Sequence, residues 1–102
     1  MSAPQLEVTW DAAKANGNIA KHGVTFAQAA TVLLDPFAVT VFDAAHSEHE
    51  ERWFTLGLSS EGKLLALAHT YQSIDAGQVR MRIISARQAI RREREQYENE
   101  PR

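Results

Sequence analysis

The dipeptide Asp35-Pro36 separates two parts of the chain that have different hydrophobic periods. Before it, Phe26, Ala29 and Leu33 recur at the spacing of one helical face, and the residue before a proline avoids the helical region. After it, apolar and polar residues alternate as they do in strands. Helices grouped on one side of hairpin-joined strands predict an α+β domain with a largely antiparallel sheet.

The first part predicts a short strand followed by two helices. Residues 6–10 alternate as a strand, and Asp11 is positioned to cap a helix that runs to about Lys21 and ends at Gly23. Thr25 and Gln28 have the spacing of a capping box, which predicts the start of the second helix.

The second part predicts four strands and a last helix. The expected strands are residues 38–42, 52–58, 64–71 and 79–84, with a polar loop at 43–51, a hairpin loop at 59–63 and a turn at 73–77. Ser85 and Gln88 repeat the capping-box spacing, so a helix is expected from there to about residue 98. The predicted order is β-α-α-β-β-β-β-α. The face on which Arg80 and Arg82 lie stays open, because a one-residue shift of register exchanges the faces.

A chain of 102 residues fits one domain, with a frayed tail expected at about residues 99–102. Cysteine is absent, so the domain must rest on its apolar core. The sequence has neither a secretory signal pattern nor an apolar run of membrane-spanning length. We therefore expect a cytoplasmic protein without a membrane segment.

Charge is distributed unevenly along the chain. The formal net charge of −2 argues against a nucleic-acid binder. However, residues 79–94 contain six arginines and a single acid, whereas residues 1–60 contain three basic residues and seven acids. A basic stripe is typical of phosphate binding, but an arginine-rich helix face is also often only solvated. Both interpretations stay open on composition alone.

Arg87 stands in the first turn of the expected last helix, where a cation opposes the helix dipole. A bound anion at the helix N-terminus would remove that conflict, and Arg82 near the end of the preceding strand would converge on it. The alternative is that Ser85 only caps the helix and Arg87 points into water. Ser85 is not part of a recognisable nucleophile motif.

The histidines also have two interpretations each. Lys21 and His22 suit a helix end, because cations there complement the dipole, but His22 also suits acid–base chemistry. His69 is expected to be a hydrogen-bonded sheet residue, with catalysis as the other option. Asp43, His46 and His49 lack a metal motif, so no metal site is expected. The tryptophans are expected in the core, although one could stack a base.

A set of motifs spread over residues 6–98 resembles the BrnT toxin family. The most specific pair is Lys21-His22-Gly23-Val24 together with Arg82-Ile83-Ile84-Ser85-Ala86-Arg87. The remaining matches are Trp10-Asp11, Lys14, Asn18, Phe26, Ala29, Asp35-Pro36, Asp43, His46, Glu51-Arg52, Leu56-Gly57, His69-Thr70, Arg94 and Tyr97. Gly17, inside the first expected helix, departs from the pattern and should weaken that helix by about 1 kcal/mol.

This resemblance implies a RelE-like fold and a ribonuclease toxin that inhibits translation by cutting RNA without a metal or another cofactor. It also implies a BrnA-like ribbon-helix-helix antitoxin that masks the toxin, in a complex expected to be 2:2. DNA would be bound only through that antitoxin. The alternatives are a non-catalytic RNA-binding module and a subunit that only binds a protein partner.

The resemblance gives the candidate residues their roles. Proton transfer is assigned to His22 with Lys21 beside it, and His69 is the reserve candidate for the acid. Stabilisation of the phosphorane charge is assigned to Arg52, Arg82 and Arg87. RNA binding is assigned to Arg80, Arg91 and Arg94.

Overall fold

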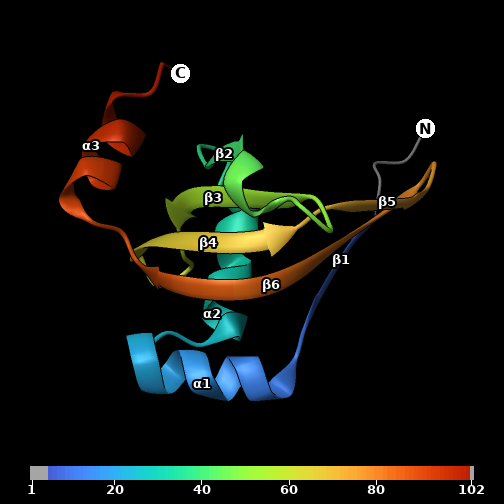
Figure 1. Ribbon diagram of the computed structural model, residues 1–102. Helices are drawn as coiled ribbons and strands as arrows, with labels where there is room; N and C mark the ends of the chain where they lie inside the picture. The colour runs from blue at the N-terminus through green and yellow to red at the C-terminus, as the bar shows by residue number, and fades with distance from the viewer. Residues whose placement is uncertain (1–4, 102) are drawn as a thin grey trace.

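The computed structural model describes residues 5–101 (Figure 1). Residue 102, in the tail expected to be frayed, lies outside this range, and so do residues 1–4. The elements follow the predicted order with one additional strand and two short 3-10 helices. They are β1 (Gln5–Trp10), α1 (Ala12–His22), α2 (Phe26–Ala30), η1 (Thr31–Leu34), β2 (Val39–Phe42), η2 (Ala44–His46), β3 (Arg52–Leu58), β4 (Leu64–Thr70), β5 (Gln72–Asp75), β6 (Gln78–Gln88) and α3 (Arg91–Asn99). None of the described helices is long and apolar enough to cross a membrane.

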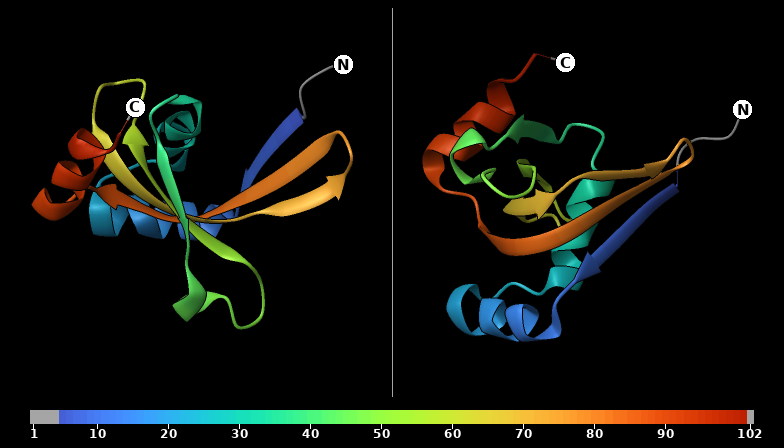
Figure 2. Two further views of the ribbon diagram at one scale, coloured as in Figure 1. Left: turned by 90° about the horizontal axis from the view of Figure 1, so that it is seen from above. Right: turned by 45° about the vertical axis from the view of Figure 1, so that its right-hand side comes forward.

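The strands form one sheet in the order β1-β6-β4-β3-β2, with β5 paired to β6. All pairs are antiparallel except β1 with β6, so the prediction of a largely antiparallel sheet is confirmed. The hairpin of β5 and β6 extends away from the body of the molecule together with β1 (Figure 2). The β2–β3 connection extends from another side of the sheet.

Helices α1 and α2 cover one face of the sheet, and both begin as the sequence predicts. The Asp11 carboxylate accepts from the Lys14 N–H at 2.9 Å, and the Thr25 hydroxyl accepts from the Gln28 N–H at 3.0 Å. Gly23 ends α1 with φ 70°, a value that glycine adopts without strain. The core between these helices and the sheet consists of Val24, Phe26, Ala29, Val32, Leu65, Leu67, Ile83 and Ala86.

Helix α3 packs on the opposite face, at the end where β6 finishes (Figure 1). Tyr97 joins Leu56, Leu64 and Ala66 in a second buried cluster. Its hydroxyl also donates to Asp35 Oδ2 at 2.6 Å. Neighbouring residues of β4 therefore face different cores, which explains why residues 64–68 are all apolar instead of alternating.

The prediction that a helix begins at Ser85 is wrong. β6 continues through Gln88, since β4 offers it a partner strand that pairs Leu67 with Ala86 and Ala66 with Arg87. On its other edge the β1 ladder stops at Ile83, and there the Asn18 side chain takes over. Asn18 donates to Ala86 O at 2.8 Å and accepts from Ala86 N at 3.1 Å. Tertiary hydrogen bonds thus override the local capping pattern.

The turn expected at residues 73–77 is also partly strand, because β5 pairs with the first residues of β6. A bulge in β6 has a larger consequence. His69 is opposite Ile83, but Ala68 is opposite Ser85, so Ile84 is the extra residue. The bulge shifts the alternation and places Arg82 and Arg87 on the same face, opposite α1 and α2, which an unbroken strand would not do.

Candidate functional site

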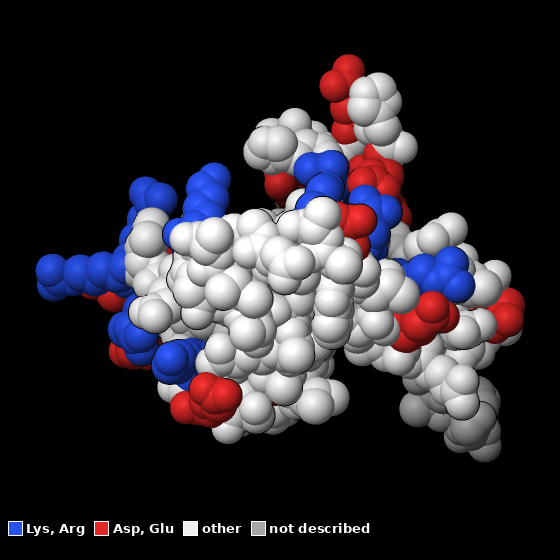
Figure 3. Space-filling model, turned by 90° about the horizontal axis from the view of Figure 1, so that it is seen from below, with Lys and Arg blue, Asp and Glu red and all other residues white. Residues whose placement is uncertain are grey.

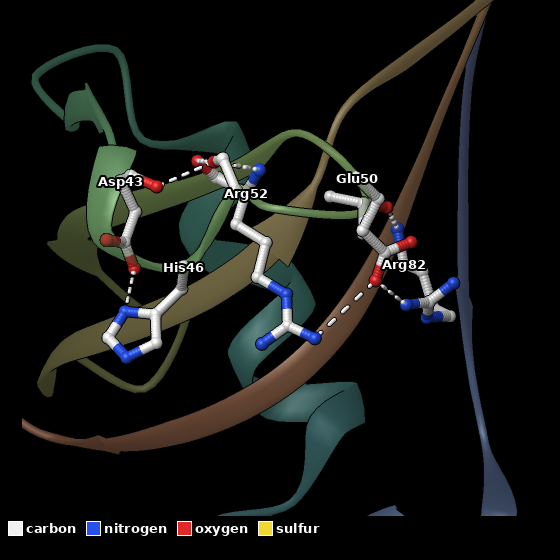
Figure 4. Close-up of polar contacts among 7 residues, drawn as sticks. Asp43, His46, Glu50, Arg52 and Arg82 are labelled. Carbon is white, nitrogen blue, oxygen red and sulfur yellow. Dashed lines mark hydrogen bonds and ion pairs between the residues drawn. The ribbon is translucent and has the colours of Figure 1, made fainter.

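Two arginines meet one carboxylate on the sheet face opposite α1 and α2. Arg82, on β6, donates from Nη2 to Glu50 Oε1 at 2.6 Å, and Arg52 Nη2 lies 3.6 Å from the same oxygen. The two residues reach this point because both lie beside Thr70 of β4. Arg52 is paired with Thr70 in the sheet, and the Arg82 N–H donates to the Thr70 hydroxyl at 2.9 Å. Figure 4 shows both guanidinium groups turned toward Glu50.

The arginines determine the ionisation of Glu50. The hydrogen bond from Arg82 lowers the pKa of the Glu50 carboxyl, with partial burial acting against it. Glu50 and Arg82 border a hollow of about 450 Å³, and its other walls are Thr9, Glu51, Thr70, Tyr71, Gln72 and Arg80. The hollow combines two guanidinium groups and hydroxyls with the carboxylates of Glu50 and Glu51, so an anion with several oxygen atoms would have to compete with these carboxylates for the guanidinium groups.

Arg87 lies further along the same face, next to α3. It makes two parallel hydrogen bonds to Glu93, Nη1 to Oε1 at 2.7 Å and Nη2 to Oε2 at 2.9 Å. The hydrogen bond with Glu93 raises the pKa of Arg87, and the hydrogen bond with Arg87 lowers the pKa of Glu93. The guanidinium carbon of Arg87 lies 5.8 Å from the centre of the Phe54 ring. Arg87 is thus held over the sheet and not in the first turn of a helix.

The other arginines proposed for RNA binding are more exposed. Arg80 pairs with Glu7 at 3.3 Å, and Arg91 pairs with Glu95 at 3.4 Å on the outer side of α3. Arg94 is exposed on the same helix. In Figure 3, lysine and arginine side chains form several separate groups at the end of the molecule where α3 lies, with acidic side chains beside some of them.

His69 is a core residue. Its relative exposure is 0%. Its Nε2 is 2.6 Å from the Thr55 hydroxyl, and its Nδ1 is 2.9 Å from the Thr70 carbonyl oxygen. A carbonyl only accepts, so Nδ1 carries the hydrogen and Nε2 accepts from Thr55. Burial lowers the pKa of His69, which keeps the ring neutral.

Lys21 and His22 lie in the last turn of α1, in the helical layer behind the sheet. The arginine face is on the other side of the sheet. Neither side chain has a polar contact among residues 5–101. The structure therefore does not bring the Lys21-His22 pair together with Arg52 and Arg82, although both residues fit the helix-end interpretation well.

Sequence reasoning missed two acidic residues, Glu50 and Glu93, and gave Asp43 and His46 no role beyond their match to the family pattern. Glu50 and Glu93 hold the arginines, and Asp43 Oδ2 accepts from His46 Nδ1 at 2.9 Å beside Arg52 (Figure 4). Glu93 was visible as the one acid in the arginine-rich segment, whereas Glu50 lies among the acids of the polar loop and has no comparable signal. No group of three or more potential metal ligands occurs within residues 5–101.

A comparison with protein families gives a match over residues 10–93, to the family described as ribonuclease toxin, BrnT, of type II toxin–antitoxin system. The match covers most of the chain and includes every motif of the arginine face up to Glu93. The chain belongs to the BrnT family. This membership confirms the resemblance inferred from the sequence motifs, and with it a ribonuclease toxin that is paired with an antitoxin.

A BrnT of known structure supports the same assignment at the level of the fold. The crystal structure of the Brucella abortus ribonuclease toxin BrnT covers 85% of this chain and 100% of its own, with a TM-score of 0.61 and 24% sequence identity. A search of curated proteins finds no match. The fold and the family therefore agree, whereas the roles of individual residues have to be argued from the geometry of this member.

Proposed function

We propose that this BrnT member cleaves RNA without a metal ion, at a reaction centre formed around Arg52, Glu50 and Arg82. The observation that carries the proposal is the convergence of two guanidinium groups on one oxygen atom, 2.6 Å and 3.6 Å away, beside a hollow of about 450 Å³. In an RNA complex a phosphate would compete with Glu50 for these donors. The two guanidinium groups, which are already in place before RNA binds, would then stabilise the negative charge that develops around the pentacoordinate phosphorus.

The chain supplies this charge stabilisation with arginine, which remains protonated at any working pH and binds phosphate through paired N–H groups. In the proposal, Arg87 binds a more distant phosphate of the same strand, after displacing Glu93. Arg80, Arg91 and Arg94 would extend the binding surface on either side. These contacts would be nonspecific and sensitive to salt.

The proposal gives no proton-transfer role to Lys21, His22 or His69. The first two residues belong to the helical layer behind the sheet. His69 has both ring nitrogens in hydrogen bonds within the core. A general acid or base must reach the proton that it transfers, directly or through one water molecule.

The proposed partner is a ribbon-helix-helix antitoxin, in a 2:2 complex that binds DNA through the antitoxin alone. Family membership supports a protein antitoxin, and the resemblance of the motifs supports its class. We propose that both proteins act in the cytoplasm. Co-expression with the adjacent reading frame, followed by mass determination of the purified complex, tests the stoichiometry.

Incubation of purified protein with total RNA in excess EDTA tests the catalytic proposal. We expect cleavage by the wild type and a loss of at least about 100-fold in rate for Arg82→Gln, the usual cost of one preorganised donor. Lys63→Gln, an exposed residue of the β3–β4 hairpin, removes the same charge away from the hollow and should retain activity. Binding of RNA without cleavage would instead favour a non-catalytic RNA-binding module. Cleavage only after metal addition would refute the metal-free mechanism.

A further inference from the structure

Arginine stabilises charge but does not exchange protons at neutral pH, so the reaction centre needs other groups for that task. Cleavage by the neighbouring 2′-hydroxyl requires one group that takes its proton and another that protonates the departing 5′-oxygen. The groups must border the Arg52–Glu50–Arg82 cluster. Only the β2–β3 connection, residues 43–51, brings both a carboxylate and an imidazole to that place in the described structure.

Asp43 and His46 form a pair with a defined orientation at the edge of this cluster. Asp43 precedes η2, and His46 is the last residue of η2. A carboxylate accepts only, so the 2.9 Å contact fixes the hydrogen on Nδ1 of the imidazole and directs Nε2 away from Asp43. The backbone holds Asp43 in place, because its N–H donates to the Arg52 carbonyl oxygen at 2.8 Å. An imidazole oriented by a carboxylate is a recurrent arrangement for proton transfer.

His46 and Glu50 border the same hollow on either side of Arg52. A depression of about 220 Å³ is lined by Ala45, His46, Glu48, His49, Glu50 and Arg52. Glu50 also lines the larger hollow that contains Arg82, so the two hollows adjoin at this residue. In Figure 4 the Arg52 guanidinium lies between the His46 ring and the Arg82 guanidinium. A phosphate bound to Arg52 would have the carboxylate and the imidazole on different sides.

We infer that Glu50 is the general base and His46 the general acid of the ribonuclease, with Asp43 as the positioning residue of His46. This inference rests on the proposed function. Glu50 takes the proton of the 2′-hydroxyl as the O2′–P bond forms. The P–O5′ bond breaks, and the leaving oxygen takes the Nε2 proton of the His46 imidazolium. The products are a 2′,3′-cyclic phosphate and a 5′-hydroxyl. Water then returns the proton from Glu50 to His46.

The arginines couple this chemistry to substrate binding. Without RNA, Arg82 and Arg52 hold Glu50 in its ionised form and make it a weak proton acceptor. A phosphate that binds both guanidinium groups shares their hydrogen bonds, so the pKa of Glu50 rises and the carboxylate becomes a better base. The base is thereby released at the moment when the phosphate reaches the site.

The pH dependence follows from groups on three elements. The charged neighbours of His46 are Asp43, Glu48, His49 and Glu50 of the connection and Arg52 of β3. The charged neighbours of Glu50 are Arg52, Glu51 and Arg82, with Arg80 and the Tyr71 phenol in the same hollow. A base that must be ionised and an acid that must carry its proton together predict a bell-shaped profile of the single-turnover rate.

Single-turnover cleavage of an RNA oligonucleotide that the wild type cuts is the direct test. The single-turnover rate should fall at least about 100-fold in Glu50→Gln and in His46→Gln. The pH–rate profile of Glu50→Gln should lose its acid limb, and that of His46→Gln should lose its alkaline limb. Asp43→Asn should lose about 10-fold and keep both limbs. His22→Gln, the same substitution on α1 behind the sheet, should stay within about threefold of wild type.

A chemical rescue separates catalysis from a structural role. When sulfur replaces the 5′-oxygen at the cleaved bond, the leaving thiolate needs no proton. His46→Gln should then cut this linkage at a rate within about threefold of wild type, whereas Glu50→Gln should remain slow. Two results would overturn the inference. In the first, the wild type cleaves RNA and His46→Gln cleaves it equally fast. In the second, His46→Gln is slow and the sulfur substitution does not restore its rate. Absence of cleavage by the wild type would instead overturn the proposed function itself.

Discussion

Asn18 is the residue for which the structure predicts the largest effect of a single polar substitution on stability. The side chain is only 5% exposed and makes three hydrogen bonds to the backbone. Asn18→Ala leaves the carbonyl groups of Val24 and Ala86 and the N–H of Ala86 without their partner. Each buried group left unpaired costs about 1 kcal/mol or more. The better helix propensity of alanine returns about 0.5 kcal/mol. We expect the free energy of unfolding to fall by about 3 kcal/mol.

Urea unfolding followed by tryptophan fluorescence measures this loss, and amide exchange at Ala86 locates it. Asn16→Ala is the matched control, because Asn16 is exposed on the same helix and should gain stability from propensity alone. A loss below about 1 kcal/mol for Asn18→Ala, with the Ala86 amide still protected, would show that Asn18 does not hold the end of β6.

Three further predictions concern stability. Gly57→Ala should lower the melting temperature by about 10 °C, because the added Cβ would lie 2.9 Å from Val32 Cγ1. A Cβ added at Gly17 meets nothing within 4 Å, so Gly17→Ala should not lower the melting temperature. The pKa of buried His69 is lowered on folding, so below about pH 6.5 the unfolded chain binds a proton that the folded chain does not. The free energy of unfolding should therefore fall as the pH drops below about 6.5. His69→Gln should remove this pH dependence in urea titrations. The pKa of Glu93 is also lowered on folding, so its pairing stabilises the protein above about pH 4.5. Glu93→Gln should cost about 1 kcal/mol at pH 7 and progressively less as the pH falls below 4.5 in the same titrations.

The elements that local chemistry specifies were predictable from the sequence. The side chains of Asp11 and Thr25 each accept a hydrogen bond from the backbone N–H three residues later. These contacts are local, so α1 and α2 begin where expected. The start of α3 was not predictable, because Ser85 and Gln88 satisfy a local pattern that β4 and Asn18 override. Asn18 is 68 residues from Ala86 in sequence. No local pattern contains that partner.

The site was predictable as a set of residue types but not as an arrangement. Arg52, Arg82 and Arg87 were all candidates, and all three lie on one face of the sheet. Their common face depends on the register of β4 with β3 and on the bulge at Ile84. Lys21-His22 was selected by its motif, but α1 carries that motif behind the sheet. Motifs identify the family, whereas the pairing of strands determines which motif residues meet.

The bulge at Ile84 makes the number of residues between two arginines meaningful. Five positions separate Arg82 from Arg87, an odd count that would point the two side chains to opposite faces of a regular strand. At this spacing a strand without the bulge would turn one arginine into the apolar core, whereas deleting Ile84 would remove the extra residue and keep both arginines on one face. Among BrnT sequences, the parity of this spacing therefore indicates whether a chain keeps the bulge. At about 3.3 Å per residue the two arginines lie roughly 15 Å apart, so in the proposed RNA complex they would bind different phosphates of one strand.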